Sequence, residues 1–283
     1  MAEEAFVLQF IKGMREKDPG LSGVKLWKIY QSRFGSHSEY KVGRDKMETI
    51  VSKYGLTVRK PRRKPQTTDS KHRYPTYPNL VKNLIPICPN RIWVSDITYI
   101  PIWNKIKKDD YKFCYLSLVT DAYSKEIVGW SVGPSLETDY PMLALEMALK
   151  RLEGKVTDLI HHSDRGVQYA SYDYVSMLRK NDIQISMTES GDPKDNAIAE
   201  RVNGIIKNEL LKDLEFHSIT EVTEAVEKAI GFYNNERPHM SLDWLTPSEA
   251  GKRTGLLTKK WCSYRELYLK DLQEKEGACI FAG

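Results

Sequence analysis

The sequence predicts an α/β protein in which a mixed five-stranded sheet carries helices on both faces and is preceded by a helical segment. Three strand-like runs at 93–103, 112–121 and 125–132 are separated by short polar turns, which favours antiparallel hairpins. Alternating strand and helix patterns follow, as is typical of a mixed sheet. Several positions in the three runs are apolar on both faces, which indicates a sheet covered on both sides.

Ahead of the sheet, apolar spacing predicts three short helices at 4–17, 22–34 and 43–54. Three short helices with tight turns resemble a helix-turn-helix module, although a generic helical bundle would show the same pattern. The basic run R-K-P-R-R-K-P at 59–65 follows directly and favours DNA binding. Five prolines within 65–90 predict an extended linker.

The remaining elements are predicted from apolar periodicity and from one capping box. We expect a helix at 139–152, a strand at 156–163, a helix at 171–180, a strand at 183–188, a long helix at 195–213 and a helix from Ser218 to about Asn235. The tail beyond Lys252 shows no strong period. The predicted domains are a basic helical domain at 1–64, a linker at 65–90, an α/β core at 91–215 and a helical extension at 216–283.

Charge is divided unevenly along the chain. Residues 1–73 carry 17 lysines and arginines against 8 acids, whereas residues 74–283 carry 26 against 30. A basic front end joined to a slightly acidic body is typical of a polyanion-binding arm, and a solvated basic surface is the alternative. The whole chain is 41% hydrophobic and 29% charged, which excludes disorder as the default interpretation.

The sequence also bears on the compartment. The four cysteines lie too far apart for a zinc knuckle or a disulfide framework, which fits a reducing environment. The first residues lack the basic start and apolar run of a signal peptide. No stretch approaches the ~18 apolar residues of a membrane span. We therefore expect a cytoplasmic, nucleoid-associated protein with no membrane partner.

Three carboxylates stand out as candidates for metal chemistry. Asp96 lies inside the apolar run W-V-S-D-I-T-Y-I, where a charge is unfavourable unless it is paired or bound to a metal. Asp164 ends a predicted strand, and Glu200 lies early on the long helix. In a mixed sheet these three can converge at one edge. Taken singly, Asp164 could be an ordinary turn residue and Glu200 a solvated helix residue.

The chemistry that suits such a cluster is phosphoryl transfer. Magnesium prefers oxygen ligands, and two such ions roughly 3.5–4 Å apart can bind both the attacking and the leaving oxygen of an in-line displacement. One carboxylate must then bridge the two ions. Asp96, held rigidly on a central strand, is the expected bridge.

Several segments together resemble a known family. W-V-S-D-I-T-Y, H-H-S-D-R-G-V-Q-Y and D-N-A-I-A-E, in that order, resemble the Asp-Asp-Glu catalytic core of transposases related to retroviral integrases. Between Asp164 and Glu200 lie 35 residues, a spacing typical of that family. T-D-A-Y-S-K-E-I-V-G-W and Y-N-N-E-R-P-H-M-S-L are similar to motifs of the bacterial insertion-sequence branch. On these segments the chain is identified as a member of the insertion-sequence "three" family, as the product of the second reading frame.

The resemblance implies a fold, an activity and partners. The fold is an RNase H-like core, with Asp96, Asp164 and Glu200 as catalytic residues holding two Mg²⁺ ions, which Mn²⁺ can replace. The activity is cleavage at transposon ends and strand transfer of a 3′-hydroxyl into DNA. The partners are transposon-end and target DNA, further copies of the chain on DNA, and an upstream-frame helix-turn-helix protein. Family members often carry aromatic residues just after the glutamate, whereas Arg201-Val202-Asn203 follow here.

Candidate DNA contacts form two groups. The first is the basic arm, with Arg59, Lys60, Arg62, Arg63 and Lys64. The second lies near the carboxylates and comprises Arg165 and the helical stripe Asn196, Glu200, Asn203 and Lys207.

The sequence leaves the roles of Arg165, Arg237 and His239 open between DNA binding and structure, and it predicts a structural role for two histidines. Arg165 could also pair with a carboxylate. His161 and His162 are neighbours on a strand, so they cannot both face the site, and a structural role is expected for them. Arg237 and His239 could touch DNA or pack at a helix end.

Two alternative functions differ from a transposase in a recognisable feature. A nuclease of the RNase H type that only hydrolyses DNA would be a compact core without a basic helical arm, and this chain carries the arm. A catalytically decayed DNA-binding protein would have lost at least one of the three carboxylates, and all three are present.

Overall fold

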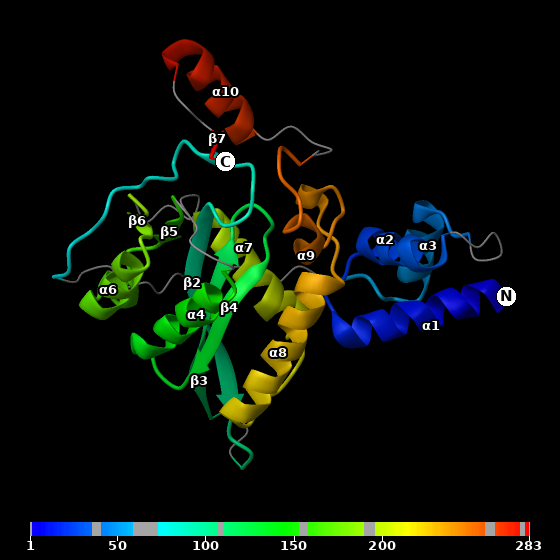
Figure 1. Ribbon diagram of the computed structural model, residues 1–283. Coiled ribbons are helices and arrows are strands. Elements are labelled where there is room, and N and C mark those ends of the chain that lie inside the picture. Colours follow the sequence, from blue (N-terminus) through cyan, green and yellow to red (C-terminus); the bar gives the residue numbers. More distant parts are fainter. Residues whose placement is uncertain are drawn as a thin grey trace.

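Figure 1 shows the chain as a computed structural model. The structure describes residues 2–35, 41–58, 73–106, 110–152, 158–189, 196–257, 264–277 and 281–282. The predicted basic arm, with Arg59, Lys60, Arg62, Arg63 and Lys64, lies outside the described residues. No helix of the described part is long and apolar enough to cross a membrane.

The centre of the molecule is a five-stranded sheet in the order β4-β3-β2-β5-β6. Its strands are β2 (Ile92–Trp103), β3 (Tyr111–Asp121), β4 (Ile127–Gly133), β5 (Ile160–Ser163) and β6 (Gln184–Met187). The first three form the predicted antiparallel meander, and β5 and β6 join β2 in parallel. This mixed topology confirms the α/β prediction and is the strand order of an RNase H-like core.

Two strands begin later than predicted, and a left-handed backbone residue precedes each start. Lys125 (φ 62°) stands in the turn before β4, and Asp158 (φ 65°) stands before β5. An extended strand cannot continue through a residue in that conformation. Residues 125–126 and 158–159 are therefore not part of the strands, whereas the predicted start at residue 156 lies outside the described residues.

Helices cover both faces of the sheet, as expected. One face packs against α4 (Asp139–Lys150), α5 (Val167–Ala170) and α6 (Tyr172–Lys180). The other packs against α7 (Ala197–Ile205) and α8 (Ile219–Asn235). The alternation is clear on β2, where Ile100 and Ile102 are 3% exposed and belong to the core beneath α7 and α8.

The predicted long helix at 195–213 is interrupted. After α7 the chain forms a π-turn over Ile206–Leu210, in which the amide of Leu211 donates to the carbonyl of Ile206 at 2.9 Å. This hydrogen bond spans five residues instead of the four of an α-helix, so the turn contains one extra residue. The helix ends before Asp213, whose φ of 64° stops it.

The three predicted N-terminal helices are present as α1 (Ala2–Lys17), α2 (Gly23–Phe34) and α3 (Arg44–Lys53). Their apolar side chains share one continuous core with α7 and α8. Where they join, the amide of Gly20 donates to the carbonyl of Glu209 at 3.1 Å, and a Cβ on Gly20 would lie 2.2 Å from that of Glu209. Glycine is therefore required at this contact.

The linker and the tail carry more structure than predicted. The described part of the linker is extended, but it is hydrogen-bonded to the sheet: the amide of Leu80 donates to Ser186 Oγ at 2.9 Å, and the amide of Met187 donates to the carbonyl of Pro78 at 3.3 Å. Further on, β1 (Ile85–Pro86) pairs in parallel with β7 (Phe281–Ala282). The tail also contains a 3₁₀ turn (Met240–Leu242), α9 (Pro247–Ala250) and α10 (Tyr264–Glu276).

Candidate active site

Asp96 lies at the point where two central strands separate. β5 pairs with β2 only from Ile92 to Ser95, and Asp96 is the next residue. Its side chain is half-buried. Oδ1 accepts a hydrogen bond from the amide of Ile97 at 2.9 Å, and Oδ2 accepts one from Nδ2 of Asn203 at 2.8 Å. Strand β2 and helix α7 thus hold both carboxylate oxygens.

The other two carboxylates come from the elements beside Asp96. Asp164 follows the last residue of β5, and its Oδ1 accepts from the amide of Gly166 at 2.9 Å. Glu200 lies on the first turn of α7 and is exposed. Since β5 pairs with β2 and α7 packs against it, these two elements bring Asp164 and Glu200 toward Asp96.

The charges of Asp164 and Glu200 act on Asp96. Burial raises the pKa of Asp96 to about 7, and the negative charge of Asp164 and then of Glu200 adds to this rise. The hydrogen bond from Asn203 lowers the pKa and only partly offsets the rise. Within the described ranges, no three acidic, histidine or cysteine side chains form a closed metal-binding group.

The two asparagines of the predicted stripe are buried rather than exposed to DNA. Asn196 is 6% exposed and donates from Nδ2 to the carbonyl of Ser95 at 2.9 Å, while Asn203 is 5% exposed and binds Asp96. The side-chain oxygens of both amides are buried without a hydrogen-bond partner in the described part of the chain. Two oxygen acceptors beside Asp96 are therefore available to a cation or its waters. A DNA contact by either residue stays a prediction.

The two predicted cations at the site also have protein partners. Nε of Arg165 donates to the carbonyl of Thr188 at 2.6 Å, which ties the end of β5 to the end of β6. The ammonium of Lys207 lies 3.4 Å from the ring centroid of Tyr99 on β2. Both side chains are half-buried at the rim of the carboxylate cluster, so their phosphate contacts stay predictions.

The two histidines before Asp164 have the expected structural role. His161 Nε2 lies 2.8 Å from Ser95 Oγ and 2.9 Å from the hydroxyl of Tyr174, and His162 Nδ1 lies 2.8 Å from Ser186 Oγ. Both are 1% exposed. Burial lowers the pKa of His161 to about 3, so the ring is neutral.

Arg237, for which the sequence left two roles open, is 1% exposed in an ion cluster between the N-terminal helices and the core. Its Nε lies 3.1 Å from Asp18 Oδ2, and its Nη2 binds Glu209 in the π-turn. Lys25 of α2 adds a contact of 3.6 Å to Glu209. His239 is 8% exposed, with its Nε2 3.4 Å from Arg237. Packing is therefore the observed role of both residues.

The family motifs contain further structural residues that sequence reasoning missed. Oδ1 of buried Asp121 accepts hydrogen bonds from the amides of Tyr123 and Ser124, at 3.1 and 2.7 Å, and so builds the turn before β4. Asn234 on α8 exchanges two hydrogen bonds of 3.0 Å with the backbone of Ile127 on β4. The residue types could have indicated these roles, because the side chains of Asp and Asn often form hydrogen bonds with backbone groups in turns.

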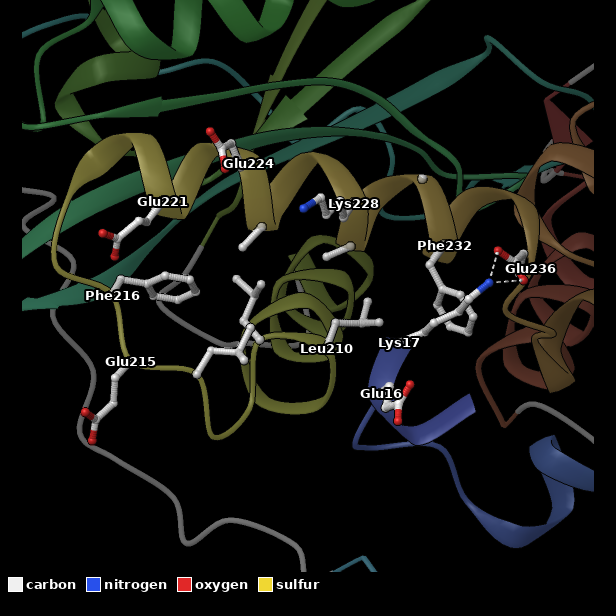
Figure 2. A pocket seen from close by; sticks show the side chains of 15 residues that line it. Glu16, Lys17, Leu210, Glu215, Phe216, Glu221, Glu224, Lys228, Phe232 and Glu236 are labelled. Atoms are coloured by element: carbon white, nitrogen blue, oxygen red, sulfur yellow. Dashed lines mark hydrogen bonds and ion pairs between the residues drawn. The ribbon is translucent and has the colours of Figure 1, made fainter. Parts of the chain in front are cut away.

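A large groove of about 770 Å³ lies elsewhere, between α8, the π-turn and the end of α1 (Figure 2). Its floor is apolar, with Leu210 and Phe232 among others, and its rim carries glutamates such as Glu221 and Glu224. None of the three carboxylates is among the described residues that line it. The candidate active site is therefore an open edge of the sheet, not this groove.

The strand order and the integrase-core matches define the class of the protein, a polynucleotidyl transferase with an RNase H-like core. Models of the integrase core domain match residues 86–193 and 181–247. The chain is 34% identical over 209 residues to the 31 kDa protein of insertion element IS600 from Shigella sonnei, covering 73% of this chain and 74% of that one. The chain belongs to the insertion-sequence "three" family of transposases.

Other relatives agree. The transposase for insertion sequence element IS629 from Shigella sonnei is 31% identical over 214 residues, covering 75% of this chain and 69% of that one. The transposase for IS904 from Lactococcus lactis is 34% identical over 177 residues, covering 62% and 67%. Among solved structures, the HTLV-2 integrase catalytic core domain in complex with magnesium matches with a TM-score of 0.45 and 21% identity, over 59% of this chain and 99% of that one.

Proposed function

We propose that this transposase cuts DNA at the ends of its own element and joins the freed 3′-hydroxyl to target DNA, using Asp96, Asp164 and Glu200 to hold divalent metal ions. The observation that supports the proposal is the placement of the three residues: Asp96 directly follows the last β2 residue paired with β5, Asp164 directly follows β5, and Glu200 lies on the helix that packs against β2. Their number, their chemistry and their placement on two strands and a helix suit a two-metal displacement at phosphorus.

The residues present fit magnesium. Carboxylate oxygens are the hard ligands that Mg²⁺ prefers, and the unpartnered amide oxygens of Asn196 and Asn203 add acceptors for bound water. Asp96, Asp164 and Glu200 would together hold the ions. When bound, the ions supply charge stabilisation to the attacking and leaving oxygens, and manganese can do the same because it accepts similar ligands.

The protein's own part is to position these ligands. The hydrogen bond from Asn203 fixes the orientation of Asp96, and the amide of Gly166 fixes that of Asp164. In the first step water forms a bond to phosphorus, the bond from phosphorus to the 3′-oxygen breaks, and that oxygen takes up a proton. In the second step the 3′-hydroxyl attacks a phosphodiester of the target and displaces another 3′-oxygen. No side chain forms a covalent intermediate in this scheme.

DNA binding is assigned to the basic arm at 59–64, whose five cations would neutralise phosphates. Replacing all five by alanine should weaken binding and flatten its salt dependence, by about 0.9 log units of slope for each phosphate that is no longer neutralised. Binding isotherms at several salt concentrations measure the slope. An unchanged slope would remove the arm from the DNA interface. Assembly of several copies on DNA, and an upstream-frame helix-turn-helix partner, belong to the same proposal.

The decisive experiment removes one carboxylate at a time. Asp96→Asn, Asp164→Asn and Glu200→Gln should each lower the rates of both cleavage and joining by at least ~10³, while DNA binding persists. The assay is magnesium-dependent cutting and joining of a labelled oligonucleotide that carries the element's end.

Asp158→Asn is the matched control. Asp158 lies just before β5, its side chain is 75% exposed, and its left-handed backbone is one that asparagine also adopts. The Asp158→Asn variant should cleave and join DNA at rates within several-fold of wild type. A variant of the three carboxylates that joins DNA at a near wild-type rate would overturn the mechanism, and a wild type that cuts without joining would favour a purely hydrolytic nuclease.

A further inference from the structure

A second polar and aromatic site lies on the surface between the N-terminal helices and the loop after α8. Here a pocket of about 650 Å³ is lined by Val24, Trp27, Lys28, Gly43, Arg44, Asp45, Lys46, Met240 and Trp244. Its volume lies in the range of ~300–1,000 Å³ that is typical of sites for small ligands. We refer to it as the two-tryptophan pocket.

The pocket combines cations with aromatic rings. The ammonium of Lys28 lies 5.1 Å from the ring centroid of Trp27 and 5.2 Å from that of Trp244. Arg44 and Lys46 add two exposed cations at the rim, and the single acid there, Asp45, is paired with Arg44 at 2.9 Å. The described lining therefore has an excess of positive charge, in contrast to the glutamate-rimmed groove on α8.

Packing accounts for only part of this arrangement. Trp27 is explained, because its Nε1 donates to the carbonyl of Val42 at 3.0 Å. By contrast, Nε1 of Trp244 is buried and has no hydrogen-bond partner in the described part of the chain. Met240 presents an apolar side chain that is 46% exposed. An orphaned donor and an exposed apolar wall beside cations indicate a ligand that supplies an acceptor and a flat apolar surface.

The loop that presents Trp244 is held in an uncommon backbone conformation. Asp243 (φ 54°) and Trp244 (φ 66°) are consecutive left-handed residues, and neither is glycine. The surrounding loop keeps them there, because the amide of Trp244 donates to the carbonyl of His239 at 2.9 Å and the amide of His239 donates to that of Leu245 at 3.0 Å. Backbone strain that is retained in this way is concentrated at binding sites.

We propose that the two-tryptophan pocket binds one unpaired nucleotide of a DNA strand. Its base would lie against Met240 and Trp244, and its phosphate would be met by Lys28 and the rim cations. Stacking of a base on an aromatic side chain next to a cation is the usual way in which proteins hold unpaired DNA. The inference rests on the proposed function in one respect, since cutting and joining create strand ends whose bases can leave the duplex.

The test compares single-stranded with duplex DNA on the full chain without divalent metal, so that no cleavage occurs. Fluorescence anisotropy of labelled dT8 and of a blunt hairpin duplex gives the two affinities. Met240→Asp should weaken dT8 binding by about 10-fold and leave duplex binding within about twofold. Leu143→Asp on α4 is the matched control, because Leu143 is 51% exposed and lies on another surface, and it should change neither affinity.

A second variant keeps the test valid if Met240→Asp fails to fold, as judged by circular dichroism. Trp244→Phe retains one aromatic ring but removes the second ring of the indole together with its N–H donor, and should weaken dT8 binding about fivefold. Equal losses for dT8 and duplex would mean a general phosphate surface and would overturn the proposal, as would unchanged dT8 binding in either folded variant.

The outcome is separable from that of the proposed function. If wild type fails to cut or join DNA but binds dT8 through Met240 and Trp244, the pocket stands and the proposed function is refuted. If wild type joins DNA while dT8 binding ignores both substitutions, only the pocket is refuted.

Discussion

The ion cluster around Arg237 should contribute strongly to stability, and its energetics can be worked out from its composition. Arg237, Lys25 and the more exposed Arg201 are the cations, and Asp18 and Glu209 are the anions. Asp18 is 0% exposed and Arg237 1% exposed. Arg237→Met preserves most of the side-chain volume but leaves Asp18 as a buried charge without its closest partner.

Breaking a buried pair by removing one member costs about 3–5 kcal/mol, because the remaining charge stays desolvated. For a chain of this size such a loss lowers the melting temperature by roughly 5–8 °C. The double variant Arg237→Met with Asp18→Asn removes both charges. Its new amide side chain would keep an oxygen to accept from the amide of Gly20, a hydrogen bond that Asp18 Oδ1 makes at 2.8 Å. The double variant should therefore be about 1–2 kcal/mol more stable than Arg237→Met alone.

Urea unfolding followed by circular dichroism measures both differences. Asp158→Asn provides a surface-acid control, since it should alter the free energy of unfolding by less than about 0.5 kcal/mol. The reasoning would be refuted if Arg237→Met stayed within about 1 kcal/mol of wild type. It would also be refuted if the double variant were less stable than the single one, because uncompensated charge would then not be the cause.

Three further predictions concern stability. Gly20→Ala should destabilise the fold by about 1–3 kcal/mol, because the new Cβ would overlap Glu209. Gly13→Ala, whose Cβ would meet no described neighbour within 4 Å, should stabilise α1 by about 0.5–1 kcal/mol. Equal effects of the two substitutions in urea unfolding would contradict the close packing at Gly20. Burial lowers the pKa of Lys25 to about 8, so below that pH the folded state holds a buried charge at a cost. Relative to Lys25→Met, the free energy of unfolding of wild type should therefore rise by about 2–3 kcal/mol between pH 7 and pH 10. A difference that does not change with pH would show that the pKa of Lys25 is not lowered. Magnesium at a hundredfold excess over its dissociation constant should raise the free energy of unfolding of wild type by about 2.7 kcal/mol, measured as a shift of the melting temperature. A shift of the same size in Asp96→Asn would show that the ion does not bind at Asp96.

The sequence was most informative where a local signal carried the chemistry. β2 begins at Ile92, one residue from the predicted start, because its apolar run is long and bounded by polar residues. The three carboxylates were found through their residue types, their order and the 35-residue spacing. Their joint role stays a prediction; in the structure the charges of Asp164 and Glu200 raise the pKa of Asp96.

What the sequence could not predict depends on long-range contacts or on single-residue irregularities. Asp18 and Arg237 are separated by 219 positions, and no periodicity indicates that they pair. The π-turn adds one residue to a helix whose apolar spacing still fits an ordinary α-helix. Asn196 and Asn203 lie on the predicted polar stripe, but both side chains are directed at β2, where Asn196 binds the carbonyl of Ser95 and Asn203 binds Asp96.

The hydrogen bonds at the two margins of the sheet have a consequence for how copies of this chain can meet. An edge strand with unpaired amides invites strand exchange and aggregation, above all when many copies gather on one DNA molecule. Here Asn234 occupies the backbone of Ile127 on β4, and the segment around Pro78 and Leu80 occupies β6. At these points the sheet cannot be extended by a neighbour's strand. Strand exchange between crowded copies is therefore disfavoured at Ile127 on β4 and at Ser186 and Met187 on β6.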